Sequence, residues 1–379
     1  MNRNAASILQ INLLILSLTG VLLGFAHINR VSGEPWNLLR VVIVIVLIVA
    51  SIILGEVISS VFHEIGHLIG GLLSGYSFVY FGCFGFVWMR ENGKLVKKHS
   101  NTKGMRGASL LSPPEMKDGT FPFRLFYFSG PFMNLVLAGI CTLLFFQCAS
   151  HFTSFAKAFL VIGLKGLMDF IMNLTPFNID GVLNDGYLLF NLGKEKNADL
   201  RLKYWRNLRI QSFITQGHRP KNIPEAYYEW ANIGKTIDDP FVLEGGLIKY
   251  KHLMDNKEFH KAKECLETIL RHLGPTLIQN QPLLHLELMF HELIGECRES
   301  KIKALDTKEV AEYVKGSALN ESTQRVSYAY SRLFSKDNAQ ANRHLELFLM
   351  ACDNSVNLGS IPGEKELIQV VNQIADGKY

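Results

Sequence analysis

Two histidines and a glutamate occupy one short stretch of a long apolar segment in this chain. They are His63, Glu64 and His67, and they form the pattern His-Glu-x-x-His. On a helix, residues four apart share a face, so His63 and His67 can bind one metal ion together. Glu64 lies beside them, where its carboxylate can take a proton from a metal-bound water. The spacing therefore predicts a zinc centre that hydrolyses peptide bonds.

The apolar segment around these residues is long enough to cross a bilayer. A crossing takes about 20 apolar residues, and residues 38–73 exceed that length. Glu56 precedes His63 by two helical turns and therefore lies on the same face. Ionisable groups within a membrane are costly and commonly functional. We expect this face to line a bundle interior or a water-filled cavity, with hydrolysis taking place inside the membrane.

A catalytic zinc site commonly has three protein ligands, so a third side chain must come from elsewhere. Residues 173–187 contain two Asp-Gly pairs, at Asp180 and at Asp185. Pro176 stops or kinks the preceding helix, and glycine lets the backbone approach closely, so a carboxylate here can reach the histidines. A surface turn is the alternative role of an Asp-Gly pair. Both aspartates are candidates on these grounds.

Two further apolar segments carry polar residues at helical spacing. Lys165, Asp169 and Asn173 are four apart, and we expect Lys165 and Asp169 to neutralise each other. Gly130-Pro131 loosens the hydrogen-bond ladder of its helix and permits close packing. Asn134 follows as an amide in an apolar helix, so it needs a partner. That partner is either another helix or the backbone of an unfolded substrate.

Composition and charge divide the chain into two parts. Of the 379 residues, 48% are hydrophobic, and nearly all the long apolar runs fall within residues 1–192, whereas residues 193–379 are charged and helix-rich. The net charge of +5 is too small to indicate nucleic-acid binding, and no basic patch has interleaved aromatic residues. The six cysteines form no Cys-x-x-Cys pair, which argues against a disulfide framework and a cysteine zinc site.

Four apolar runs predict membrane helices, and basic residues predict their orientation. The runs cover residues 8–26, 38–73, 123–146 and 155–174. Lysine and arginine are concentrated after the second and the fourth run, which predicts cytoplasmic N- and C-termini. We expect the chain to lie in the cell membrane. Residues 76–89 are aromatic and β-branched and are followed by an Asn-Gly pair at 92–93, a hairpin signal. Such a hairpin can dip into the membrane and pair with an extended substrate; an ordinary interfacial loop is the alternative.

The C-terminal part has the pattern of short amphipathic helices. Residues 247–270 and 328–349 each resemble a tetratricopeptide-type helix pair, although a strict 34-residue period is absent. A helical solenoid of this kind commonly binds a peptide or a protein partner. The alternative is a plain helical bundle with no separate function.

The ordered set of motifs resembles the site-2 protease family of intramembrane zinc metalloproteases. The matching stretches are HEIGH at 63–67, GPFMN at 130–134, and NLTP at 173–176 followed by Asp-Gly, within about residues 40–190. The resemblance implies that His63 and His67 bind zinc and that Glu64 is the catalytic acid and base.

The same resemblance assigns supporting roles and a third ligand. It implies that Asn134 and Asn173, with Gly130-Pro131, handle substrate or support the site. One aspartate of the late Asp-Gly motif is the third ligand, and this chain departs from the family by having two such pairs. Asp185 is preferred because Asp-Gly-Tyr-Leu-Leu-Phe opens a new apolar stretch, as the family's motif does. Asp180 is the reserve.

These observations predict an all-α fold in two domains. Residues 1–192 should form a multi-pass transmembrane bundle of about four helices, with the hairpin dipped into the membrane, and residues 193–379 a cytoplasmic, tetratricopeptide-like helical domain. The expected activity is that of a metalloendopeptidase with one zinc ion, acting on a membrane-associated protein or peptide in regulated proteolysis or peptide maturation. A membrane-anchored scaffold without catalysis is the alternative, and a metal transporter is a third reading.

Overall fold

The computed structural model describes residues 3–33, 38–91, 93–99, 107–179, 182–228 and 237–378. The chain forms two compact units. The first comprises Met1–Phe84 with Met105–Arg201, and the second comprises Gly85–Gly104 with Leu202–Tyr379. Each unit is treated by itself below.

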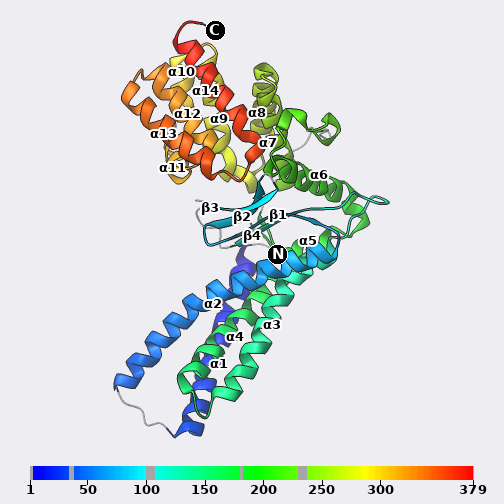
Figure 1. Cartoon of the computed structure of the whole chain (residues 1–379), viewed down its shortest axis with the longest axis vertical. Coiled ribbons are helices and arrows are strands. Elements are labelled where there is room, and N and C mark those ends of the chain that lie inside the picture. Colours follow the sequence, from blue (N-terminus) through cyan, green and yellow to red (C-terminus); the bar gives the residue numbers. More distant parts are fainter. Residues whose placement is uncertain are drawn as a thin grey trace. The chain divides into compact units, whose positions relative to one another are not determined.

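Four long helices form the larger part of the first unit. They are α1 (Arg3–Ser32), α2 (Leu38–Leu73), α3 (Arg124–Cys148) and α4 (Thr153–Leu174). Helices α2, α3 and α4 pack against one another, and α1 packs against α4 (Figure 1). A helix satisfies its own backbone hydrogen bonds, which an apolar segment in hydrocarbon must do. This explains why the apolar runs fold as uninterrupted helices.

Three of these helices are long and apolar enough to cross a membrane. The apolar stretches are Ser7–Arg30 in α1, Val41–Leu73 in α2 and Arg124–Cys148 in α3. The fourth predicted span, residues 155–174, lies in α4, which is less uniformly apolar because it carries Lys157, Lys165 and Asp169.

A small sheet accompanies the helices, so the fold is mostly helical but not all-α. In the first unit, β1 (Ser77–Cys83) pairs antiparallel with β4 (Gly107–Ser112), and both strands pack against α2. In the second unit, β2 (Phe86–Glu91) pairs antiparallel with β3 (Lys94–His99). The aromatic run that precedes the predicted hairpin turn thus forms two strands, β1 and β2. Phe84 and Gly85 both have positive φ there and reverse the chain before the turn at Gly93.

The first unit ends in short elements that follow α4. They are β5 (Asn178–Ile179), β6 (Val182–Leu183), α5 (Asp185–Asn191), the 3-10 turn η1 (Glu195–Asn197) and the start of α6 (Ala198–Thr215). Strands β5 and β6 pair antiparallel, and α5 packs against α3 and α4. This arrangement brings the beginning of α5 back to the helices that precede it.

The second unit is a stack of helices around a large apolar core. Its elements are α7 (Pro240–Asp255), α8 (Phe259–His272), α9 (Gln281–Ile294), α10 (Glu299–Leu305), α11 (Lys308–Gly316), α12 (Glu321–Ala329), α13 (Asn338–Asn354) and α14 (Ile361–Ala375), with the short turns η2 (Pro220–Asn222), η3 (Glu225–Tyr228), η4 (Pro275–Asn280), η5 (Tyr330–Phe334) and η6 (Leu358–Ser360). A smaller apolar cluster lies where α6 meets η2, η3 and α7. The helix pair predicted at 247–270 corresponds to α7 and α8, and that at 328–349 to α12, η5 and α13.

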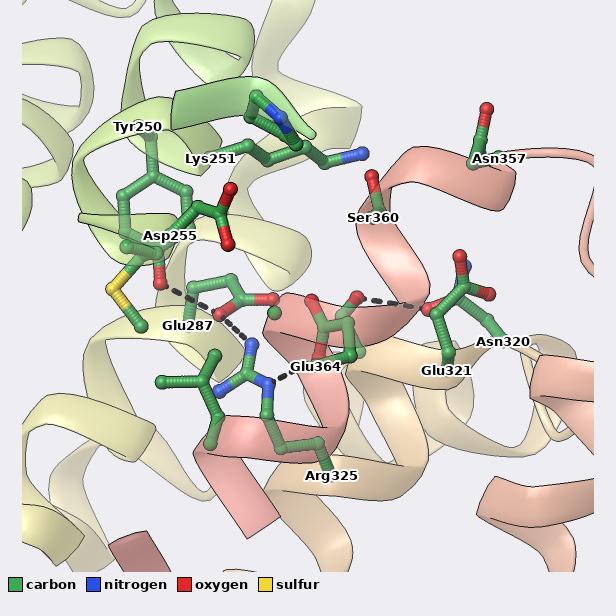
Figure 2. Close-up of a pocket in the computed structure, with 15 residues that line it drawn as sticks. Tyr250, Lys251, Asp255, Glu287, Asn320, Glu321, Arg325, Asn357, Ser360 and Glu364 are labelled. Atoms are coloured by element: carbon green, nitrogen blue, oxygen red, sulfur yellow. Dashed lines mark hydrogen bonds and ion pairs between the residues drawn. The ribbon is translucent and has the colours of Figure 1, made fainter. Parts of the chain in front are cut away.

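A buried arginine links several helices of this stack. The Arg325 side chain is only 2% exposed, and its guanidinium donates to Glu287 Oε2 and to Glu364 Oε2, each at 2.7 Å. Figure 2 shows this network beside a cavity of about 60 Å³, with Tyr250 also donating to Glu287. Burial raises the pKa of Glu364, whereas Arg325 outweighs the effect of burial at Glu287 and lowers the pKa of that carboxyl.

We expect Arg325→Leu to destabilise the second unit by about 3–5 kcal/mol, because two buried carboxylates lose their counter-charge. Guanidinium unfolding of the full chain, followed by far-ultraviolet circular dichroism, measures this. Arg343→Leu is the matched control, since Arg343 is exposed on α13. An equal effect of the two substitutions would contradict the prediction.

Glycines bring α2 and α3 into close contact in the first unit. A Cβ atom at Gly66 would overlap the Ser129 carbonyl, and one at Gly70 would overlap the Ser129 side chain. Glycines four apart on one helix face allow this approach of two backbones. The contact lies beside His63 and His67 and therefore fixes the surroundings of those side chains.

We expect Gly66→Ala to destabilise the helix bundle by about 1–3 kcal/mol, the usual cost of overpacking. Thermal unfolding of the full chain in detergent micelles measures the change. Gly139→Ala on α3 is the control, because a Cβ there meets nothing within 4 Å. Equal melting temperatures of the two variants would contradict this prediction.

Candidate metal centre

Three side chains from two elements converge on one point. His63 and His67 lie one turn apart on α2, and Asp185 is the first residue of α5. Asp185 Oδ2 is 3.0 Å from His63 Nε2 and 3.3 Å from His67 Nε2, and the two nitrogens are 3.1 Å apart. Ligand atoms about 2.0–2.1 Å from a tetrahedral zinc ion are themselves about 3.3 Å apart. The three groups can therefore hold one metal ion between them.

Hydrogen bonds orient both imidazole rings toward Asp185. The Nδ1 atom of His67 is 2.8 Å from the Phe126 carbonyl and donates its proton to it, which leaves Nε2 as an acceptor. The Nδ1 atom of His63 is 3.2 Å from the side-chain amide of Asn134. A carbonyl acceptor such as Phe126 is the partner typical of a histidine that binds a metal through its other ring nitrogen. At His63, the same role requires the Asn134 amide to present its oxygen rather than its nitrogen to Nδ1.

Helix α3 supplies the surface against which the His67 ring lies. A Cβ atom at Gly130 would overlap that ring, so only glycine permits the contact. Pro131 follows within the helix and is buried. Of the residues predicted to support the site, Gly130 thus contacts one histidine through its backbone and Asn134 contacts the other through its side chain.

Asn184 places Asp185 at the site. Its side-chain oxygen accepts from Tyr187 N at 3.0 Å and from Phe177 N at 2.8 Å, which caps α5. Its amide nitrogen donates to the carbonyls of Asn173 and Thr175, at 3.1 and 2.7 Å. Asn184 therefore ties the start of α5 to the end of α4. Asparagine directly before the Asp-Gly helix start is the capping signal that sequence reasoning had missed.

Asn173 and Asp180 are the other two positions predicted in this region, and only Asn173 lies among the described residues. Asn173 takes part in the site through its backbone carbonyl, which accepts from Asn184. Asp180, the reserve ligand, lies outside the described residues. Within the described part of the chain, Asp185 is the carboxylate that joins the two histidines.

Glu64 is held by strand β4. Its Oε2 accepts from Ser109 Oγ at 2.5 Å, and the side chain is largely buried. A Cβ atom at Gly107 would fall 2.6 Å from Glu64 Cγ, so the strand passes close to the carboxylate. Neither Ser109 nor Gly107 belongs to a motif, and sequence reasoning did not find them.

A chain of polar groups leads from His63 into the bundle. Ser59 Oγ donates to Asn134 Oδ1 at 3.4 Å and to Asp169 Oδ2 at 2.5 Å. Lys165 Nζ binds Asp169 Oδ2 at 2.5 Å, as predicted, and also Glu56 Oε2 at 3.1 Å. The polar face predicted for α2 is thus matched by a polar face of α4, where the Lys165 ammonium lies between the carboxylates of Asp169 and Glu56.

No protein-family model, curated protein or solved structure matches this chain. The centre itself consists of two imidazole nitrogens and one carboxylate around a single point, with the Glu64 carboxylate on the same helix.

We expect Asp185→Asn to weaken zinc binding by more than about 100-fold, the upper end of what loss of an outer partner costs. Competition with a chelator, measured on the purified full chain, gives the affinity. Asp180→Asn is the matched control and should retain wild-type zinc affinity. Loss of zinc from Asp180→Asn, with retention in Asp185→Asn, would reverse the ligand assignment.

Proposed function

We propose that the protein is an intramembrane zinc metalloprotease. The observation that carries the proposal is the convergence of His63, His67 and Asp185, with Glu64 on the same helix. The donor set has two nitrogens and one oxygen, which suits zinc, and three protein ligands leave a position for water or substrate. Two neutral imidazoles and one carboxylate leave a bound Zn²⁺ ion with a net positive charge.

Zinc held by these three residues would lower the pKa of a water molecule toward about 7 and polarise a peptide carbonyl. Glu64 then accepts the proton of that water and passes it to the leaving amine. Ser109 keeps the Glu64 carboxylate in place during both transfers. The pairing of His63 with Asn134 and of His67 with the Phe126 carbonyl keeps both rings in one orientation.

The membrane placement belongs to the same proposal. We assign four membrane helices, with α4 as the fourth. We further propose that the chain lies in the cell membrane with both termini in the cytoplasm. Helix α4 is suited to this role because Lys165 binds Glu56 of α2 and Asp169 accepts from Ser59 of α2, so neither side chain is left to face lipid. The reacting groups then act on a bond that the substrate presents within or at the edge of the bilayer.

Strand β4 offers a way to hold that substrate. It is the end strand of its sheet within the described chain, and it carries Ser109, the partner of Glu64. A peptide in extended form can add to an open strand edge through backbone hydrogen bonds. Its carbonyls would then lie near Glu64, and a substrate helix with helix-breaking residues would reach this form more readily.

The second unit would recruit the substrate or a regulatory partner. Its paired helices are compatible with a tetratricopeptide-like stack, whose usual ligand is a peptide or protein segment. We therefore assign the cleavage to the first unit and partner binding to the second, in regulated proteolysis or peptide maturation.

We expect Glu64→Gln to lower the rate of cleavage by about 10²–10⁴-fold, the usual contribution of a general base, while zinc content stays at the wild-type level. Cleavage of casein, an unfolded substrate, by the full chain in mild detergent provides the assay. Glu195→Gln is the control, because Glu195 is an exposed glutamate outside the site. Wild-type activity in Glu64→Gln would refute the proposed base, and zinc binding without any cleavage by the wild type would favour the scaffold.

A further inference from the structure

A second cavity of the first unit lies where α3 begins, away from the metal ligands. Its volume is about 470 Å³, and Phe123–Leu125, Thr120, Gly193 and Arg201 contribute to its wall. Two arginines and no carboxylate are among the described residues that line it. Such a lining gives the cavity a positive potential, because arginine keeps its charge at any physiological pH.

Arg124 is the first residue of α3 and reaches over this cavity. A Cβ atom at Gly193 would lie 3.3 Å from Arg124 Nη2, which places the guanidinium beside the Gly193 backbone. The side chain is exposed, and no carboxylate pairs with it in the described part of the chain. Its charge is therefore available to a ligand.

Arg201 contributes the second charge from α6. Its Nε donates to the Gly119 carbonyl at 2.8 Å and its Nη1 to the Leu192 carbonyl at 2.7 Å. Both partners are neutral, so they fix the guanidinium without cancelling its charge. Leu192 is the C-cap of α5, and Asp185 is the first residue of the same helix. The cavity is thus connected to the helix that carries the carboxylate of the metal centre.

The position of the cavity along α3 indicates the source of its ligand. The apolar stretch of α3 begins at Arg124 and continues to Cys148. In the membrane placement proposed above, this end of the helix falls at a membrane surface. Phe121 and Phe123 line the same cavity and are buried with their ring centroids 5.7 Å apart. Phosphate matches arginine well because the guanidinium presents several donors in a planar fork. Basic pockets at the ends of membrane helices commonly take anionic lipid head groups.

We propose that this cavity binds the phosphate head group of an anionic phospholipid through Arg124 and Arg201. The proposal rests on the membrane placement of α3 given above, but not on proteolysis. Lipid binding and peptide cleavage are measured separately, so either can fail without the other.

The test uses the full chain in neutral detergent micelles, titrated with short-chain phosphatidylglycerol in a calorimeter. We expect saturable binding of phosphatidylglycerol and none of phosphatidylcholine. Arg124→Gln should weaken binding about fivefold, which corresponds to about 1 kcal/mol for one arginine near an anionic surface. Arg124→Lys, which keeps the charge, should retain most of the affinity.

Lys196→Gln is the control, because it removes the same charge from a nearby exposed residue that does not line the cavity. Equal affinities of the wild type and Arg124→Gln, or equal losses in Arg124→Gln and Lys196→Gln, would overturn the proposal. Glycerol 3-phosphate tests the alternative that the phosphate group comes from a soluble metabolite rather than from a lipid. If it binds as tightly as phosphatidylglycerol, the site takes a soluble phosphate and the lipid assignment is wrong.

Discussion

The contact of the Asp185 carboxylate with two imidazoles of α2 is the interaction around which the first unit is arranged. It joins residues more than a hundred positions apart, at 3.0 and 3.3 Å. For this contact to form, α3 must lie close to α2, and the chain must return to the site after α4. Glycines at 66, 70 and 130 allow α2 and α3 to approach each other. Asn184 holds the returning chain at the end of α4.

The same unit has to accommodate several ionisable groups in an apolar bundle. A charge buried without a partner is far more costly than one that is paired and hydrogen-bonded. Here Lys165 lies between Asp169 and Glu56, and Ser59 connects this group to Asn134. Asn134 in turn contacts His63, so the arrangement that pairs the charges also orients a side chain of the metal centre.

The second unit also pairs its buried charges. Arg325 lies between two glutamates, and its guanidinium also stacks on the Phe290 ring at 3.9 Å from the centroid. The network joins α9, α12 and α14, which are distant in sequence. A buried ion pair of this kind favours one arrangement of the helices, because any other leaves a charge unpaired.

The sequence by itself determined the apolar helices and the pairing of Lys165 with Asp169, because both follow from residue type and helical spacing. It also singled out His63, Glu64 and His67 as one local group. Tertiary structure alone decided that Asp185 reaches the histidines, that Ser109 holds Glu64, and that Asn134 contacts His63. It also reversed the chain at Phe84-Gly85 and added β4, so that the predicted hairpin became part of a four-stranded sheet. The spacing of polar residues along the sequence indicates which face of a helix is polar. The contacts listed above depend instead on how closely separate elements approach one another.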